Sequence, residues 1–239
     1  MTTALTTPAP RAMTEFKDAV RVQESVLTSL EKRTLRWLAV RLPARVNSDH
    51  LTLLALTAML GAGLSYWLAS RQPVVGLMLV IVCLALNWFG DSLDGTVARV
   101  RQQQRPRYGY YVDHVVDAFG ALFLFGGLAL SGFMTPWVAG VLLLAYFMLC
   151  LEVYLATHSL GRFQMSFFKM GPTELRILLA IGNLVVLWRP MPVIAGHAYK
   201  LFDIGGVIGA AGLFLTLVYS AVRNTRALYL AEPIPPPQK

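Results

Sequence analysis

Residues 91–117 read DSLDGTVARVRQQQRPRYGYYVDHVVD, a stretch that carries four aspartates within 27 residues. Asp91 and Asp94 are three positions apart, and Asp113 and Asp117 are four apart, so each pair shares one face if its segment is helical. The sequence on both sides of the stretch is uncharged for at least 18 residues. The pattern predicts two antiparallel hydrophobic helices, joined by a short basic loop, whose acidic faces meet.

The composition is that of an integral membrane protein. The 239 residues include 21 Lys and Arg against 13 Asp and Glu, a formal net charge of +8, yet only 14% are charged and 56% are hydrophobic. A soluble domain usually has about a quarter of its residues charged, and disordered chains lack apolar residues. A nucleic-acid-binding protein could have this net charge but not this hydropathy, so we expect no nucleic-acid partner. Carboxylates inside a bilayer then require a functional reason.

The hydrophobic pattern predicts an all-α polytopic fold with six transmembrane helices, since a spanning helix needs about 20 largely apolar residues. Gly132 and Pro136 divide the longest uncharged segment into two spans. The predicted spans are residues 51–70, 73–101, 109–131, 135–157, 172–188 and 204–222. We assign these helices to one transmembrane domain over residues 46–230.

The segment before this domain differs in character. Residues 1–13 are rich in Thr, Ala and Pro, and we expect them to be disordered. Across residues 14–45, apolar side chains recur at helical spacing with basic residues between them, which predicts an amphipathic helix in the membrane interface. A soluble helix packed on the bundle is the alternative. The segment lacks the apolar core of a signal peptide, and residues 231–239 form a Pro-rich tail.

The basic residues predict the orientation of the chain. With the N-terminus in the cytoplasm, eighteen of them lie on the cytoplasmic side and only Arg71, Arg189 and Lys200 lie opposite. Because basic residues are retained on the cytoplasmic side, both termini and the aspartate stretch should face the cytoplasm. In a bacterial cell this would be the inner membrane.

The four aspartates suit a divalent-metal site. Like charges repel strongly at low dielectric constant, so these carboxylates would stay ionised only beside cations. Oxygen donors without Cys or clustered His favour Mg²⁺ or Mn²⁺, and four carboxylates suffice for two ions. The alternative is a set of ion pairs with the neighbouring arginines.

Small residues accompany the aspartates. Gly95 and Ala98 leave space one turn from the first two, Arg99 adds a positive charge beside that space, and Gly109 opens the next helix. A cleft with metals, an arginine and glycine-sized gaps fits a diphosphate attached to a flat base. Metals that neutralise its oxygens would make a nucleoside monophosphate a good leaving group.

The arrangement D-x2-D-G-x2-A-R-x9-G-x3-D-x3-D resembles the signature of the CDP-alcohol phosphotransferase (CDP-alcohol phosphatidyltransferase) family, membrane enzymes of phospholipid synthesis. All eight fixed positions match. Residues 47–54, Asn-Ser-Asp-His-Leu-Thr-Leu-Leu, are similar to the segment that opens the first helix of that family. The resemblance covers about residues 45–230.

The resemblance implies roles for individual residues. Two divalent ions would be held by Asp91, Asp94, Asp113 and Asp117. The CDP moiety would be bound by Asp91, Asp94, Gly95, Ala98, Arg99, Gly109 and Asp113. Asp117 would also be the general base that an acceptor hydroxyl needs near neutral pH, and attack on phosphorus would release CMP. The resemblance further implies a homodimer.

The substrates are less specified. Family members with a phosphorylated acceptor often have Lys or Arg after the last aspartate, where this chain has Ala118. His114 is more typical of the branch that transfers choline or ethanolamine phosphate to diacylglycerol, although it could simply donate a hydrogen bond to a metal-binding Asp. Short members most often use CDP-diacylglycerol, which we favour as donor with an alcohol or lipid as acceptor.

Three further basic residues lie near the cytoplasmic ends of the fourth and fifth spans, and could bind an acceptor or lipid phosphate or merely follow the orientation rule: Arg162, Lys169 and Arg176. Functions of another class remain open. Intramembrane carboxylates also occur in divalent-cation transporters, although these would not need the small residues and Arg99. A member that lost activity and serves as a scaffold is a third hypothesis, against which the intact motif argues.

Overall fold

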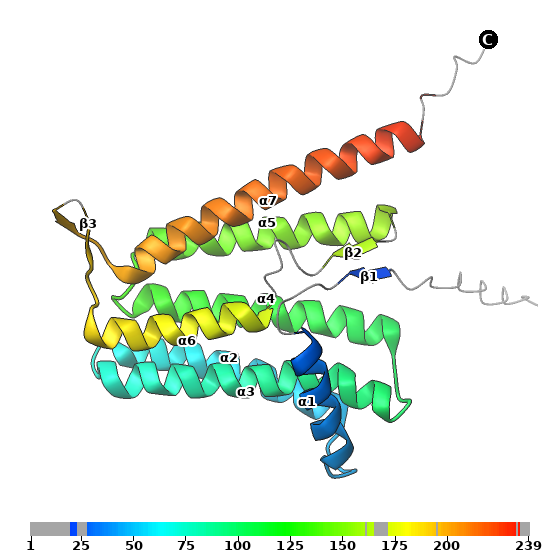
Figure 1. Cartoon of the computed structure of the whole chain (residues 1–239), viewed down its shortest axis with the longest axis horizontal. Coiled ribbons are helices and arrows are strands. Elements are labelled where there is room, and N and C mark those ends of the chain that lie inside the picture. Colours follow the sequence, from blue (N-terminus) through cyan, green and yellow to red (C-terminus); the bar gives the residue numbers. More distant parts are fainter. Residues whose placement is uncertain are drawn as a thin grey trace, which may run out of the picture.

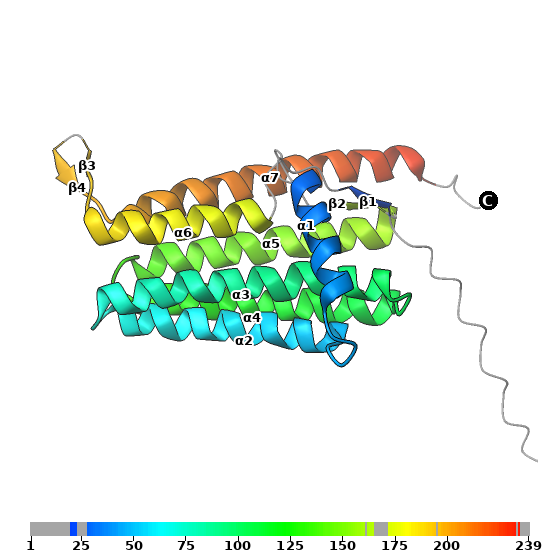
Figure 2. The same ribbon diagram turned by 60° about the horizontal axis from the view of Figure 1, so that its bottom comes forward.

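The computed structural model of the chain describes residues 20–22, 28–160, 162–164, 172–194, 196–232 and 234. Within these residues it is all-α apart from four short strands. Helices α2 to α7 run along a common direction, while α1 crosses the bundle near one end (Figures 1 and 2). The helices are α1 (Thr28–Arg41), α2 (Ser48–Ala69), α3 (Pro73–Val100), α4 (Pro106–Leu130), α5 (Pro136–Leu160), α6 (Pro172–Trp188) and α7 (Leu201–Ala231). The strands are β1 (Val20–Val22), β2 (Arg162–Gln164), β3 (Val193–Ile194) and β4 (His197–Ala198).

Five helices, α2, α3, α4, α5 and α7, are long and apolar enough to cross a membrane. The chain is therefore a multi-pass integral membrane protein. The predicted spans coincide closely with helices, and the fifth of them, residues 172–188, corresponds to α6. This helix has 17 residues, or roughly 26 Å at 1.5 Å per residue, which is shorter than the hydrocarbon core of about 30 Å.

The helix starts follow from local sequence. Helices α3, α4, α5 and α6 all begin with proline, which lacks the N–H that a first helical turn leaves unbonded and has a backbone angle already suited to a helix. Helix α2 begins differently, because the Asn47 side chain accepts a hydrogen bond from the His50 backbone while the His50 ring bonds the Asn47 N–H. This reciprocal cap is formed within the segment 47–54 that the sequence singled out.

The N-terminal prediction was wrong in extent. A continuous helix was expected over residues 14–45, but α1 covers only Thr28–Arg41, and Val20–Val22 forms a strand that pairs in parallel with Arg162–Gln164. The β-branched Val20 and Val22 favour a strand where a partner strand is present, and that partner comes from the distant end of α5. Residues 1–19 and 23–27, which include the predicted disordered terminus, lie outside the described part, as does most of the predicted tail.

Helix α2 is the centre of the packing. It packs against both α3 and α4, whereas α3 and α4 make few contacts with each other, so the predicted pair of direct neighbours is instead joined through α2. Glycines permit these approaches: a Cβ on Gly90 of α3 would lie 2.5 Å from the Leu51 carbonyl oxygen, and one on Gly127 of α4 would lie 2.6 Å from the Gly63 carbonyl carbon. Such small-residue contacts let membrane helices approach closely.

Helix α1 is held on the bundle by a small apolar core. Leu35 and Ala39 on its inner face are buried with Leu51 of α2 and with Leu93 and Val97 of α3. Its opposite face is exposed and carries several basic residues and Trp37, whose ring lies under the Arg41 guanidinium at 4.0 Å. A separate and larger core lies between the spanning helices. Thus α1 is anchored to the end of α3 that carries the first aspartates.

Candidate active site

Four carboxylates from two helices gather at one end of the bundle. Asp91 and Asp94 lie on the last three turns of α3, and Asp113 and Asp117 lie on the first half of α4. Asp117 interacts electrostatically with the other three carboxylates and with Arg176 of α6. The predicted cluster is therefore brought together even though α3 and α4 do not pack directly, because α2 aligns both helices.

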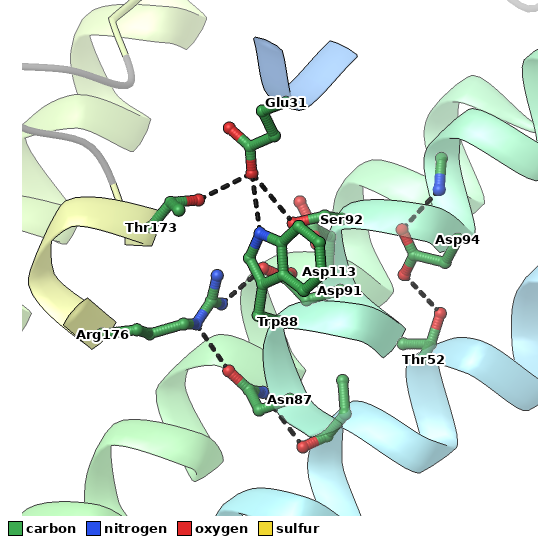
Figure 3. Close-up of polar contacts among 12 residues, drawn as sticks. Glu31, Thr52, Asn87, Trp88, Asp91, Ser92, Asp94, Asp113, Thr173 and Arg176 are labelled. Carbon is green, nitrogen blue, oxygen red and sulfur yellow. Dashed lines mark hydrogen bonds and ion pairs between the residues drawn. The ribbon is translucent and has the colours of Figure 1, made fainter. Parts of the chain in front are cut away.

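Asp91 forms an ion pair with Arg176 (Figure 3). The guanidinium Nη2 lies 2.5 Å from the Asp91 carboxylate, and both side chains are largely buried, with 16% and 23% of their surfaces exposed. The Arg176 Nε donates a 2.8 Å hydrogen bond to Asn87 Oδ1, and Asn87 in turn donates to the Ala55 carbonyl of α2. This series of hydrogen bonds, from α6 through α3 to α2, fixes Arg176 beside the Asp91 carboxylate.

Asp94 is held by hydrogen bonds from α2 and from the backbone of its own helix. Thr52 of α2 donates a 2.7 Å hydrogen bond to one carboxylate oxygen, and the Gly95 N–H donates to the other. Ser48 donates a 3.0 Å hydrogen bond to the Asp94 carbonyl. Donors to a carboxylate favour its ionised form and fix its orientation. The first turns of α2 therefore orient the second aspartate of the motif.

On α4, Asp113, His114 and Asp117 each offer one ligand atom, and these atoms all lie within 4.8 Å of one another. Asp117 is exposed, and Asp113 is half-buried. The His114 ring stacks on Tyr154 of α5 at a centroid distance of 4.7 Å and meets the edge of Tyr110 at 4.2 Å. Its Nδ1 lies 3.6 Å from Asp113, which is beyond a normal hydrogen bond. The tyrosines thus fix a ring at the edge of the acidic cluster.

Among the residues that the structure describes, neither glycine of the Gly95 and Gly109 pair is needed for close contact with another helix. A Cβ on Gly109 would meet nothing within 4 Å, and one on Gly95 would meet only the side chain of Arg99. Arg99 is exposed and donates a 3.0 Å hydrogen bond to Thr96. These two glycines differ from Gly90, which is required for contact with α2, and the space beside them is open.

A pocket of about 400 Å³ adjoins this space at the start of α2. Its lining includes Ala98, one of the predicted CDP-binding residues, together with seven others: Asn47, Ser48, Asp49, Val97, Gln103, Gln104 and Arg105. Arg105 pairs with Asp49 across the pocket, and this hydrogen bond raises the pKa of the arginine. The lining therefore combines amides, an acid and a base next to the motif.

Two of the predicted phosphate-binding residues cannot be placed in the site. The backbone of Arg162 lies in β2, but its side chain, like all of Lys169, lies outside the described residues. Arg176 alone is seen in the cluster. Sequence reasoning missed its contact with Asp91 and the supporting role of Asn87, although a buried Asn one turn before Asp91 on the same helix face was a usable signal.

Chemically, the cluster is a set of oxygen donors that needs positive charge. Arg176 supplies one cation, which pairs with Asp91, while Asp117 interacts electrostatically with Arg176 and with the other three aspartates. Carboxylates are the donors that Mg²⁺ and Mn²⁺ prefer, so the residues present fit a divalent-metal site.

This is a multi-pass membrane protein with an acidic, arginine-bearing cluster at one end of its bundle. The family model for CDP-alcohol phosphatidyltransferase matches residues 46–218, and the chain belongs to this enzyme family. Its members transfer a substituted phosphate from a CDP-alcohol. A comparison with curated proteins gives no match. The matched range begins just before the α2 cap and ends within α7, so it includes every residue of the acidic cluster.

Proposed function

We propose that this chain transfers a substituted phosphate group from CDP-diacylglycerol to an acceptor hydroxyl and releases CMP. The observation that carries the proposal is the gathering of four carboxylates from α3 and α4 beside Arg176, next to open space at two glycines. A purely structural ion-pair network would not need the empty space at Gly95 and Gly109. A substrate with a diphosphate would use both features.

The same residues support two divalent ions as cofactors, Mg²⁺ or Mn²⁺, held by Asp91, Asp94, Asp113 and Asp117. Bound there, the ions would neutralise the diphosphate oxygens and make CMP a better leaving group. The proximity of ligand atoms from Asp113 and Asp117 supports half of this set. On α3, hydrogen bonds from Thr52 and the Gly95 N–H hold the Asp94 oxygens in fixed positions, which is the preorganisation that a ligand residue requires.

The CDP moiety would lie along the C-terminal turns of α3 and the start of α4. Gly95, Ala98 and Gly109 would admit it close to the backbone, and Arg99 would face its phosphates. The aspartates of the cluster other than Asp117 would approach it through the metals. The 400 Å³ pocket beside Ala98 supports this location, because its amide side chains can hydrogen-bond a base.

Asp117 would act as general base. It is the exposed member of the cluster, so an acceptor hydroxyl can reach it, and it would take the hydroxyl proton as the oxygen attacks. The new bond joins this oxygen to the phosphorus that carries the diacylglycerol, and the bond from that phosphorus to the bridging oxygen breaks. CMP leaves with the bonding electron pair. In this step Asp117 accepts the proton directly from the acceptor hydroxyl.

Arg176 would bind a phosphate of the substrate. Its guanidinium lies in the cluster with Nε on Asn87 and one Nη on Asp91, and a planar guanidinium can share its remaining N–H groups with phosphate oxygens. Arg162 and Lys169, from the connection between α5 and α6, would contribute to the same acceptor or lipid phosphate.

One observation supports an alternative CDP-linked substrate. His114, which follows the third aspartate, is fixed between Tyr110 and Tyr154 at the edge of the cluster. This residue supports the alternative in which CDP-choline or CDP-ethanolamine donates to diacylglycerol. Because the chemistry at phosphorus is the same, only the lipid product separates the two.

The orientation and assembly belong to the same proposal. Six spans, with α6 as the shortest, would place both termini and the cluster on the cytoplasmic side, where eighteen basic residues would lie. The exposed basic face of α1 and Trp37 support a position of this helix in the membrane interface. The active unit would be a homodimer.

The test is CMP release from purified protein in lipid nanodiscs with Mg²⁺ or Mn²⁺. CDP-diacylglycerol is offered with a panel of alcohols, and separately CDP-choline or CDP-ethanolamine with diacylglycerol, and the lipid product is identified. No CMP from any donor would refute the enzymatic proposal. Divalent-metal flux into liposomes without cytidine nucleotide would instead support a transporter, whereas donor binding without turnover would support a scaffold.

A further inference from the structure

One carboxylate oxygen of Glu31 joins three helices (Figure 3). Its Oε1 accepts hydrogen bonds from Trp88 Nε1 at 2.9 Å and from Ser92 Oγ at 3.4 Å, both on α3, and from Thr173 Oγ1 on α6 at 2.7 Å. Glu31 itself lies in the first turn of α1. A helix that crosses the bundle is thereby tied to two other helices, α3 and α6, at one point.

The chemistry of this contact is specific. The three donors are an indole N–H and two hydroxyls, all neutral, and hydrogen bonds to an ionised carboxylate are stronger than neutral ones. The basic residues that follow Glu31, Lys32 and Arg33, are exposed. The glutamate therefore turns inward from a helix whose outer face is basic, and it does so to meet side chains of α3 and α6.

These three donors lie next to the residues that form and support the ion pair between Arg176 and Asp91. Ser92 is adjacent to Asp91, and Trp88 is adjacent to Asn87, whose amide oxygen accepts from Arg176. Thr173 is one turn before Arg176 on α6. Glu31 thus holds α3 and α6 together at the level where Arg176 meets Asp91.

A second contact joins the N-terminal segment to the beginning of the connection between α5 and α6. Strand β1 pairs in parallel with β2, in the register Val20 with Arg162 and Val22 with Gln164. The N-terminal segment therefore contacts the chain before residues 165–171 through a backbone ladder, and the chain after them through Glu31. Both ends of the connection are fixed by residues that precede α2.

We propose that Glu31 is a positioning residue for the transfer reaction: it fixes the start of α6 against α3 and so sets the place of the Arg176 guanidinium beside Asp91. This inference rests on the proposed function. It assigns to α1 a task in the active site in addition to any contact with the membrane surface, and it requires that Glu31 act through Arg176.

The first experiment measures turnover of Glu31→Gln and Thr173→Val in nanodiscs. A hydrogen bond to a charged group shifts the equilibrium toward the ordered arrangement by more than about tenfold. We therefore expect kcat to fall about tenfold for each variant, while KM for the CDP donor changes by less than about threefold. The matched controls are Glu232→Gln, at an exposed acid beyond α7, and Thr57→Val, at an exposed hydroxyl that bonds only its own helix. Both controls should retain full kcat.

The deciding measurement is a double-mutant cycle. In an Arg176→Ala background, Glu31→Gln should cause no further loss, because the residue through which it acts has been removed. A general loss of fold stability would reduce activity equally in both backgrounds. Additive losses, or full kcat in Glu31→Gln, would overturn the proposal.

Amide hydrogen exchange provides a readout that needs no turnover. In Glu31→Gln, exchange should accelerate in α1 and in residues 173–180 of α6 and remain unchanged in α2 and α4. Unchanged exchange in α6 would refute the positioning role even if the wild-type protein released no CMP. Absence of CMP release in the wild type, with the exchange effect present, would refute the proposed function and leave the coupling of α1 to α6 established.

Discussion

The contact between Gly127 of α4 and Gly63 of α2 is the place where the packing that forms the site can be tested most directly. A Cβ on Gly127 would lie 2.6 Å from the Gly63 carbonyl carbon, whereas ordinary contact begins at 3.4 Å. The Gly63 carbonyl oxygen would lie closer still, so Gly127→Ala requires α4 to move from α2 by more than about 1 Å. Overpacking of this kind costs about 1–3 kcal/mol of folding free energy.

The neighbouring glycine is a matched control. A Cβ on Gly126 would meet nothing within 4 Å, and alanine in a helix interior is about 0.5–1 kcal/mol more favourable than glycine. Gly126→Ala should therefore be neutral or stabilising. The gain in helix propensity is common to both variants, so their unfolding free energies should differ by the overpacking cost alone, about 1–3 kcal/mol. The two substitutions are chemically identical and one residue apart.

The assay is thermal unfolding in detergent, followed by CMP release below the melting temperature. Gly127→Ala should melt below the wild type and Gly126→Ala at or above it. Because α4 carries Asp113 and Asp117, its displacement should also lower kcat, since errors of about 1 Å in catalytic geometry can cost about 100-fold. Equal melting temperatures for the two variants would refute the reasoning that α2 sets the position of α4.

Three other predictions concern the site itself. Asp117→Asn should abolish turnover and leave CDP-donor binding largely intact; a loss of binding as severe as that of Asp94→Asn would make Asp117 chiefly a metal ligand. Gly109→Val should leave the melting temperature nearly unchanged, because no atom lies within 4 Å of an added Cβ, but raise KM for the donor at least tenfold; an unchanged KM would remove this glycine from the CDP site. Chelation with EDTA should stop CMP release, and added Mg²⁺ or Mn²⁺ should restore it; turnover that persists in the chelator would contradict the metal requirement.

The contacts of Arg176 with Asp91 and Asn87 bear on how a charged substrate would bind. Arg176 occupies a position beside Asp91 that a metal or a phosphate would share. Its Nε remains bonded to Asn87, and Asn87 is anchored on α2. The guanidinium can therefore exchange one carboxylate partner for a phosphate without losing its support, which is a favourable property in a group that meets a charged ligand.

The sequence by itself determined the class of fold and the acidic motif on which the proposed site is built. Uncharged runs long enough to span a bilayer, with proline at the start of four helices, specify helices within a few residues, because both signals are local. The spacing of the four aspartates, three and four positions apart, likewise specifies which face carries them, because the period of a helix is fixed. The family followed from the same residues.

Only the tertiary structure decided which elements meet. That α2 lies against both α3 and α4, that Arg176 pairs with Asp91 across 85 positions, and that Glu31 reaches Thr173 across 142 positions are not local properties. The strand at Val20 had the same origin, because its partner lies after α5. Apolar periodicity shows that a face is buried but not against which helix, and that choice depends on how glycine and alanine surfaces fit together in three dimensions.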